Sequence, residues 1–393
     1  MVSGVDEMKI LAIAPTFYPH MGGAERSFYE LYSRLPRYGI DVDLVTPNLG
    51  GKRFEEIAKG FRVFRVGKKK RFRWAKLLFY QIYEYIKIKE LLRKNKYDLV
   101  HCQYVFPNGF VGYKISKLIK KPLIFSVHHF GTGMDIAKAQ QNPKLINPFM
   151  RFLLRKSNLI ITTGLTQNNF LKWLFGKLPR KAITIKLGSP EIKKISDMAK
   201  NDLKKKYGFE RKKVVFSIGR LNKRKRFEEI IKTAEILKNE RDIVFLIAGK
   251  GEEYSNLQKL VNKKNLENIK LLGFVDDKKR EDLFLISDVF AYASEFEGSG
   301  IVYTESMSYS TPVAAYENEA VKNIIKNDNF GFVVKRNPKE LANAILRLIK
   351  DKKLSDKIVK NCYDLIKKEH NWEIYAEKYA REFKKINKER NIK

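Results

Sequence analysis

Two carboxylates stand eight positions apart around a short glycine-rich turn in the second half of the chain. Glu297 precedes Gly298, Ser299 and Gly300, and Glu305 follows in the first turns of a predicted helix. The largely apolar run at 288–293 before them is typical of a buried parallel strand. Carboxylates near the ends of such strands commonly accept hydrogen bonds from ribose or sugar hydroxyls. The spacing therefore predicts a polyhydroxylated, nucleotide-linked ligand.

A basic segment earlier in the same half carries the charge that a diphosphate needs. Arg220 and Lys225 lie between a predicted strand at 214–218 and a helix that begins near Phe227. Their cationic groups can hold a diphosphate, and the helix N-terminus adds its partial positive charge. Backbone amides at 298–300 are expected to add donors to phosphate. Taken alone, the basic segment also fits a solvated loop.

Two series of alternating strands and helices would position these residues. The first series has strands at 9–15, 41–46, 99–102, 123–127 and 159–162, and the second at 214–218, 244–248, 269–272, 289–293 and 311–315. This alternation predicts an α/β protein with a doubly wound parallel sheet in each half. We expect two Rossmann-like domains, residues 1–190 and 191–370, with the linker at 187–190.

Length and cysteine content agree with this class. A chain of 393 residues is too long for one ordinary hydrophobic core, so two domains are expected. The sequence shows no uninterrupted apolar run of ~18 residues and no signal-peptide pattern. The distant Cys102 and Cys362 predict two buried thiols rather than a disulfide, which fits a reducing cytoplasm.

The positive charge is concentrated in the first half. The formal net charge is +35, and residues 1–190 carry 34 Lys+Arg against 12 Asp+Glu. Between Leu99 and Gly188 there are 14 basic residues and one acid, Asp135. A general lysine bias, as in some thermophiles, does not by itself remove acids from one stretch. The charge predicts attraction to lipid headgroups, phosphate-bearing acceptors or nucleic acid.

A basic lead-in, Lys68 to Arg73, precedes a long apolar-rich helix. One predicted face carries Trp74, Leu78, Ile82, Tyr85, Ile88 and Leu92, and an adjacent stripe carries Phe79, Tyr83 and Ile86. This pattern fits a helix packed on the sheet. The basic lead-in beside aromatic residues leaves contact with a membrane surface open.

Taken together, these motifs resemble the retaining glycosyltransferases of family 4, the glycosyl transferases group 1, which have the GT-B fold. The resemblance covers almost the whole chain and keeps the family's motif order. It rests on Gly22-Gly23-Ala24-Glu25, Asp98-Leu99-Val100-His101, Ser126-Val127-His128, Gly219-Arg220-Leu221 with Lys225, Glu297 to Glu305, and Asn371-Trp372-Glu373. It implies two domains facing an interdomain cleft, with a C-terminal helix at 371–393 that crosses back to the first domain.

The resemblance also implies roles for the residues of the second domain. Arg220 and Lys225 would hold the diphosphate of the donor. Glu305 would bind the nucleotide ribose, and Glu297 would bind the transferred sugar. The second domain is therefore expected to bind the nucleotide sugar, and the first domain to bind the acceptor.

Two residues of the first domain receive roles in the same way. His128 would lie at the sugar, although a histidine at a strand end is otherwise often structural and His129 is its neighbour. Gly23 would let the backbone approach phosphate or acceptor. The chain departs from the family at Ser299, at Arg226 and at Glu319-Ala320, and these changes leave donor identity and loop geometry open.

No metal or other cofactor is expected. Asp41-Val42-Asp43 is similar to the metal motif of other glycosyltransferases, but it lies inside a predicted strand. The histidines show no zinc-type spacing with cysteines; they are His20, His101, His128, His129 and His370. Arg220 and Lys225 can neutralise a diphosphate leaving group without a metal.

The sequence thus predicts a metal-independent retaining hexosyltransferase that uses a nucleotide sugar. The acceptor is expected to be a glycan or lipid-linked and membrane-associated, and the protein to be cytoplasmic and peripheral at the inner face of the membrane. No nucleic-acid module is readable. One alternative is a non-enzymatic basic protein that binds anionic membrane or nucleic acid, and another is a nucleotide-sugar epimerase of the same fold. The sugar, base, acceptor and linkage stay open.

Overall fold

The computed structural model describes residues 8–19, 22–67, 77–128 and 143–391. The basic lead-in at 68–73, Trp74, His20, His129 and Asp135 lie outside these ranges. The chain forms two compact units. The first unit combines Met1–Gly188 with Trp372–Lys393, and the second is Ser189–Asn371.

An eight-stranded sheet forms the first unit, in the order β3-β4-β2-β1-β5-β6-β7-β8. Its strands are β1 Met8–Ile13, β2 Ile40–Pro47, β3 Phe54–Ala58, β4 Phe61–Val66, β5 Leu99–Gln103, β6 Leu123–Val127, β7 Leu159–Thr162 and β8 Ala182–Thr184. Edge strand β3 runs antiparallel to β4, and the other pairs are parallel. Strand β1 lies between β2 and β5, with Ile10 opposite Val42 and Leu99.

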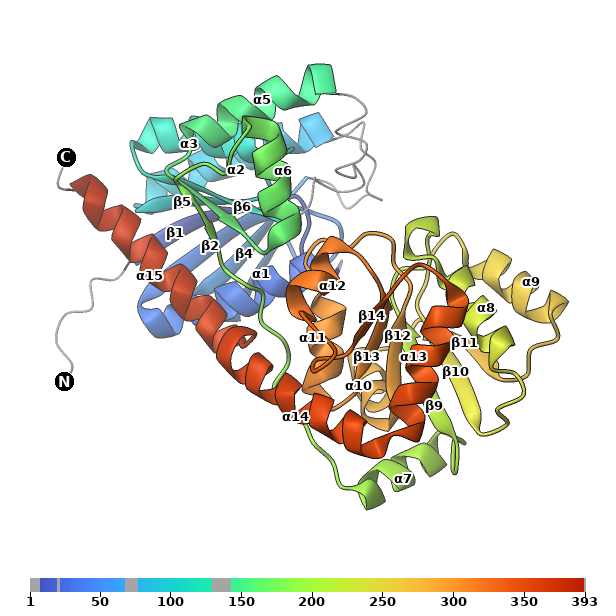
Figure 1. The fold of residues 1–393 in the computed structure, drawn as a ribbon. Coiled ribbons are helices and arrows are strands. Elements are labelled where there is room, and N and C mark those ends of the chain that lie inside the picture. Colours follow the sequence, from blue (N-terminus) through green and yellow to red (C-terminus); the bar gives the residue numbers. More distant parts are fainter. Residues whose placement is uncertain (1–7, 20–21, 68–76, 129–142, 392–393) are drawn as a thin grey trace, which may run out of the picture. The chain divides into compact units, whose positions relative to one another are not determined.

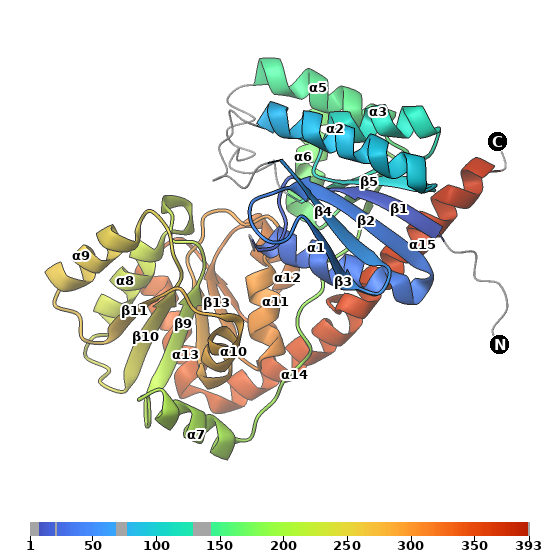
Figure 2. The same ribbon diagram turned by 180° about the vertical axis from the view of Figure 1, so that it is seen from behind.

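Helices cover both faces of this sheet. They are α1 Gly23–Arg34, α2 Leu77–Lys94, α3 Gly109–Ile119, α5 Pro143–Lys156, α6 Leu165–Phe175 and α15 Trp372–Asn391, with a 3-10 turn at Leu35–Tyr38. Helices α2, α3 and α5 lie over one face, while α1 and α15 pack together over the other (Figures 1 and 2). The last helix of the chain is therefore part of the first unit.

The orientation of α2 differs from the sequence prediction. Ile88 is buried as expected, but Ile82 and Ile86 are each 58% exposed, and Tyr85 also faces solvent. Glu84 takes an inward position instead and accepts a 2.6 Å hydrogen bond from Asn108 Nδ2. Helical periodicity predicts that apolar residues occupy the buried face. It cannot predict a buried carboxyl group whose hydrogen-bond partner lies on another element.

The second unit has a six-stranded parallel sheet in the order β11-β10-β9-β12-β13-β14. Its strands are β9 Lys213–Ile218, β10 Ile243–Ala248, β11 Ile269–Gly273, β12 Val289–Tyr292, β13 Val313–Tyr316 and β14 Phe332–Val334. The chain builds outward from β9 in one direction and then returns to place β12 on its other side. The carboxyl ends of β9 and β12 thus flank a topological switch point, where sheets of this kind bind ligands.

Eight helices are described around this second sheet. They are α7 Asp197–Lys206, α8 Phe227–Ile236, α9 Tyr254–Lys263, α10 Asp277–Ile286, α11 Ile301–Ser308, α12 Glu319–Ile324, α13 Pro338–Lys350 and α14 Lys352–Glu369, with a 3-10 turn at Lys223–Lys225. Helix α13 covers one face and α10 the other, as the two opposite views show (Figures 1 and 2). A continuous apolar core lies between the helices and the sheet.

The predicted class, an α/β protein with two largely parallel sheets, is confirmed. Cys102 and Cys362 are buried free thiols, as expected. The prediction missed four strands, β3, β4, β8 and β14, three of which lie at sheet edges. None of the described helices has both the length and the apolar content needed to span a bilayer.

Candidate functional site

Two loops meet at the switch point of the second unit. One follows β9 at 219–226 and the other follows β12 at 293–300. The backbone N–H of Glu295 donates to the carbonyl of Arg224 at 3.2 Å, and the Arg224 guanidinium lies 5.7 Å from the Phe296 ring centroid. These contacts fix the two segments that carry the predicted diphosphate and sugar residues side by side.

Lys225 and Glu297 form an ion pair between these loops. Both side chains are mostly buried, and Lys225 Nζ also lies 5.6 Å from the centroid of the Tyr292 ring. The backbone N–H of Lys225 donates to Asn222 Oδ1 at 3.2 Å, which shapes the turn. Burial, increased by the Glu297 charge, raises the pKa of Tyr292 well above its ordinary value. The structure thus brings together two residues that were predicted for adjacent parts of one ligand.

Glu305 has a cationic partner that the sequence interpretation missed. Glu305 is buried on α11, and its carboxylate accepts from Arg280 Nη2, which comes from α10. Arg280 Nε is buried without a hydrogen-bond partner among the described atoms. No local motif signals this arginine, because the pair joins two helices that are 25 positions apart. The Arg280 charge holds the Glu305 carboxylate in one place.

The glycine turn between the two carboxylates leads directly into α11. Gly300 is the N-cap of the helix with φ 66°, and a Cβ there would approach Tyr303 Cδ2 to 2.7 Å. Gly298 is buried beside it, and Ser299 is partly exposed. The helix begins at Ile301, so its first amides and positive dipole end adjoin this turn.

Arg220 lies exposed at the carboxyl end of β9. The neighbouring loop after β10 packs closely against this segment: Leu221 N donates to the Lys250 carbonyl at 2.9 Å. A Cβ at Gly249 would lie 1.9 Å from the Gly219 oxygen, and one at Gly251 would lie 2.0 Å from the Leu221 oxygen. The glycines at 249 and 251 are therefore required by loop packing.

His128 lies in the first unit, directly after β6, and is buried. Its Nε2 is 2.7 Å from Gln103 Oε1, and its carbonyl accepts a 2.5 Å hydrogen bond from Gln167 Nε2. Its ring meets Phe28 edge to face at a centroid distance of 4.9 Å. The imidazole is therefore held in one orientation from several sides.

The Gly-Gly loop leads into the N-terminus of α1, where Gly23 is the first, exposed residue. Glu25 turns inward in the first turn and accepts a hydrogen bond from the Thr16 hydroxyl. A Cβ at Gly22 would lie 2.7 Å from Glu25 Oε2. A larger residue at 22 would therefore displace the Glu25 carboxylate, while Gly23 leaves the helix N-terminus open.

The Asp41–Asp43 segment serves the core of the first unit. Asp43 is buried in β2 and accepts hydrogen bonds from Arg62 Nε at 2.7 Å and from the Tyr97 hydroxyl at 2.6 Å. This agrees with the structural role expected for a strand position. Within the described ranges, no group of three or more His, Cys, Asp or Glu residues is arranged to hold a metal ion.

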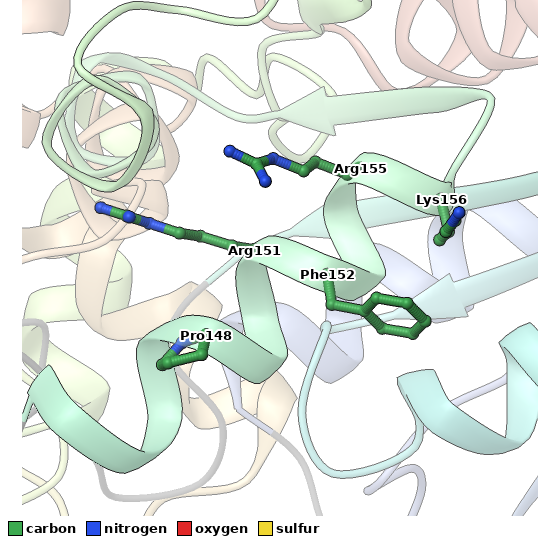
Figure 3. A pocket seen from close by; sticks show the side chains of 5 residues that line it. All are labelled: Pro148, Arg151, Phe152, Arg155 and Lys156. Carbon is green, nitrogen blue, oxygen red and sulfur yellow. The ribbon is translucent and has the colours of Figure 1, made fainter.

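A cationic hollow of about 560 Å³ lies on α5 of the first unit (Figure 3). It is lined by Pro148, Arg151, Phe152, Arg155 and Lys156. Arg151 and Arg155 extend from the same side of the helix, and Lys156 Nζ lies 5.8 Å from the Phe152 ring centroid. The combination suits an anionic group with an apolar neighbour.

Comparison with known proteins adds to this geometry. Residues 21–188 match the family described as Glycosyltransferase Family 4, and residues 199–365 match Glycosyl transferases group 1. The chain is 23% identical to the alpha-monoglucosyldiacylglycerol synthase of Streptococcus pneumoniae over 356 residues, which cover 87% of this chain and 78% of that protein.

Two solved structures share the fold. Sucrose-phosphate synthase from Thermosynechococcus elongatus superimposes with a TM-score of 0.83 at 19% identity, covering 96% of this chain and 99% of that one. Anabaena HepE in complex with UDP-glucose gives a TM-score of 0.75 at 19% identity, covering 96% and 100%. Both matches span essentially the whole chain and therefore include both sheets.

Proposed function

The chain belongs to glycosyltransferase family 4, whose GT-B enzymes retain anomeric configuration, and on that premise we propose that it transfers a hexose from a uridine diphosphate sugar to a membrane-associated acceptor. The uridine nucleotide is suggested by HepE, which was solved with UDP-glucose. The lipid acceptor is suggested by the relative named a synthase of a glucosyldiacylglycerol. The proposal specifies a hexose but neither which hexose nor the linkage that is formed.

The Lys225–Glu297 ion pair carries the donor assignment. A cation for the diphosphate and a carboxylate for sugar hydroxyls must sit where the sugar joins the phosphate, and these side chains touch at the switch point. When a donor enters, the β-phosphate competes with Glu297 for Lys225, and Arg220 supplies a second, exposed cation. Glu297 is then available to the sugar hydroxyls.

In the proposed reaction, the bond between the anomeric carbon and the diphosphate oxygen breaks. Lys225 and Arg220 stabilise the negative charge that develops on the departing diphosphate. Glu305, held by Arg280, accepts hydrogen bonds from the ribose. The acceptor hydroxyl attacks the same face of the sugar, and the departing phosphate takes its proton. His128 is assigned to the sugar in this scheme, and Gly23 to the approach of the acceptor.

We expect transfer to continue in a chelator, because two cations are available to neutralise the leaving group. The measurement is the initial transfer rate in EDTA against the rate with added magnesium or manganese. Strict loss in EDTA that either metal restores would contradict the assignment of Lys225 and Arg220.

The decisive test of the donor proposal is a panel of nucleotide sugars. Release of nucleoside diphosphate is measured for each sugar, with and without a lipid extract. We expect release from a uridine diphosphate hexose that rises when lipid is added. Interconversion of the sugar without release of nucleoside diphosphate would instead favour the epimerase alternative.

Helices α3 and α5 support the acceptor part of the proposal. Neither helix contains an acid, and Phe110, Leu118 and Phe152 on them are exposed. The cations around the α5 hollow stand beside this apolar surface. A surface of this kind attracts an anionic lipid headgroup and buries aromatic rings at the interface. We therefore place the protein peripherally at an anionic membrane, at its cytoplasmic face, which its two free thiols suit.

Vesicle binding tests this surface. Replacing Arg151, Arg155 and Lys156 by Ala should weaken binding to vesicles containing phosphatidylglycerol by roughly 100-fold or more, since each cation contributes about 1 kcal/mol. A matched control replaces three exposed lysines of the second unit, Lys339, Lys353 and Lys357. Equal binding to neutral and anionic vesicles, unaffected by salt, would refute the proposal, and preference for nucleic acid would favour the non-enzymatic alternative.

A further inference from the structure

A continuous chain of buried hydrogen bonds runs from His128 through the first unit to its last helix. His128 Nε2 lies 2.7 Å from Gln103 Oε1, and Gln103 Nε2 donates to the Tyr32 hydroxyl at 2.9 Å. Tyr32 continues to His101 Nδ1 at 3.0 Å, and His101 Nε2 lies 2.8 Å from Ser126 Oγ. Ser126 Oγ then lies 2.9 Å from the hydroxyl of Tyr379 on α15.

Every member of this chain is almost fully buried. His101 and Tyr32 are uncharged at neutral pH, because burial lowers the pKa of His101 to about 3 and raises that of Tyr32 well above its ordinary value. A neutral imidazole has one donor and one acceptor nitrogen. If one of its nitrogens accepts a hydrogen bond, the other must therefore donate one. The direction at one end therefore fixes the direction at the other.

The donors can be assigned from the Gln103 amide. Its Nε2 donates to Tyr32, so the Tyr32 proton is directed at His101 Nδ1, and His101 carries its own proton on Nε2 toward Ser126. Its carbonyl oxygen can only accept, so His128 must donate from Nε2. Turning the amide over would reverse every donor in the chain.

We propose that Gln103 is a positioning residue that holds His128 in the tautomer protonated on Nε2, and that Tyr32 and His101 keep the Gln103 amide from turning. His128 Nδ1 then carries the lone pair and can act only as a hydrogen-bond acceptor. The tautomer follows from this network alone. Its consequence for transfer rests on the proposed function, in which His128 contacts the sugar.

The hydrogen-bond network joins segments that lie far apart in the sequence. Gln103 and His101 come from β5, Ser126 from β6, Tyr32 from α1 and Tyr379 from α15. Because two strands and two helices hold the polar atoms, no single side chain can rotate without leaving a buried donor or acceptor unsatisfied. A network satisfied in this way restricts the imidazole to one state.

Nitrogen NMR of the histidine rings tests the assignment directly. The chain has five histidines, so imidazole signals can be assigned by single replacements. With ¹⁵N-labelled histidine above pH 8, we expect His128 to show a protonated Nε2 and an unprotonated Nδ1. Gln103→Met and Tyr32→Phe should each give mixed tautomers. Protonated Nδ1 in the wild type, or unchanged signals in Gln103→Met, would overturn the proposal.

Tyr97→Phe provides the matched control. It also removes a buried tyrosine hydroxyl from the first unit, but that hydroxyl donates to Asp43 and is not part of the hydrogen-bond network of His128. It should leave the His128 signals unchanged, and a shift equal to that in Tyr32→Phe would show a general loss of packing instead.

Kinetics separate this inference from the proposed function. Gln103→Met should lower kcat roughly tenfold, the effect of about one hydrogen bond, while affinity for UDP stays constant. Mixed tautomers with unchanged kcat would leave the positioning intact and refute the role of His128. Equal loss of kcat and UDP affinity would show that Gln103 acts through folding and would overturn the positioning role.

Discussion

The side chains near the carboxyl ends of the strands differ in kind between the two units. In the first unit, the side chains around His128 are neutral and joined by hydrogen bonds, with Gln103 and Tyr32 nearest to it. In the second, the two motif carboxylates each have a cation, Lys225 for Glu297 and Arg280 for Glu305. One unit is suited to orienting a ring, and the other to exchanging charges with a phosphate.

The difference has a physical origin. A neutral network gains from burial because each bond strengthens at low dielectric, but it has no charge to attract a distant anion. An ion pair next to a ligand site can trade one partner for the ligand, at the cost of desolvating both groups beforehand. This difference agrees with the proposal that the ion-paired residues bind the diphosphate and that the neutral network orients the histidine.

Removing Arg280 should give the largest effect and tests whether the second unit depends on its ion pairs. Arg280→Met leaves the buried Glu305 carboxylate without its cation and should lower the free energy of unfolding by about 3 kcal/mol. All three tryptophans belong to the first unit, so tryptophan fluorescence follows that unit, while far-UV circular dichroism follows both. The dichroism transition should shift to lower temperature, and the fluorescence transition should stay.

Two controls accompany this variant. Lys350→Met removes a cation from an exposed pair with Glu240 in the same unit and should change stability by less than about 1 kcal/mol. Arg280→Met combined with Glu305→Met should recover much of the loss, because no unpaired charge stays buried. Equal shifts for Arg280→Met and Lys350→Met would show that the buried pair contributes nothing special.

Removing Lys225 should mainly affect catalysis. Losing one charge-assisted contact to a buried diphosphate costs about 1.5–3 kcal/mol, so Lys225→Ala should lower transfer roughly 10- to 100-fold. Arg220→Ala is expected to act in the same direction. Lys223, exposed on the same turn, provides the control, and Lys223→Ala should retain full activity. A folded, fully active Lys225→Ala protein would rule out its diphosphate role.

Exchanging each motif carboxylate for an amide sharpens the division of labour inside the second unit. Glu297→Gln should reduce transfer and discrimination between donor sugars about tenfold more than affinity for UDP. Glu305→Gln should mainly weaken binding of UDP, because the amide lacks the negative charge that strengthens both the proposed ribose contact and the hydrogen bond from Arg280. Calorimetric UDP affinities and transfer rates for both variants decide the matter, and the opposite pattern would mean that the two roles are interchanged.

The last prediction concerns the pH dependence of stability and the Glu84 carboxyl in the interior of the first unit. Burial raises the pKa of its carboxyl well above 4.5. As the pH rises above that ordinary value, the unfolded chain loses a proton that the folded chain keeps, so stability falls until the folded pKa is reached. Glu84→Gln cannot titrate, and its advantage over the wild type should grow from pH 5 to pH 8.

The fluorescence transition of the first unit measures this change. The amide oxygen introduced by Glu84→Gln can still accept the hydrogen bond from Asn108, so packing should be preserved. An equal difference between variant and wild type at both pH values would show that Glu84 does not stay protonated in the folded protein.

Much of the second-unit site could be predicted because its signals are local. A buried strand followed by polar residues shows where a strand ends, and β12 begins at Val289 as expected. Glu297, Arg220 and Lys225 lie in the segments that follow such strands, and Glu305 lies on the helix that comes next. The neighbouring arginine at 280 could not be found, because nothing within its own helix distinguishes it from other exposed-side cations.

The interior of the first unit was less accessible to sequence reasoning. His101, Ser126 and His128 belong to motifs identified in the sequence, but no pattern distinguishes Tyr32, Gln103 and Tyr379 from other residues of their helices and strand. Glu84 did not figure in the helical pattern predicted for this segment. Its burial depends on Asn108, 24 positions away, so no helical periodicity reports it.

The sequence by itself determined the class of each element and the chemistry available at its ends. Apolar runs and their spacing act over a few residues, so strands such as Leu159–Thr162 were predicted with their observed bounds. Only the tertiary structure decided which side chains became partners. Lys225 meets Glu297, 72 positions away, because β9 and β12 are neighbours in the sheet, and His128 is joined to the last helix because α15 packs on the first unit. Such pairings depend on strand order and helix docking, which no local pattern contains.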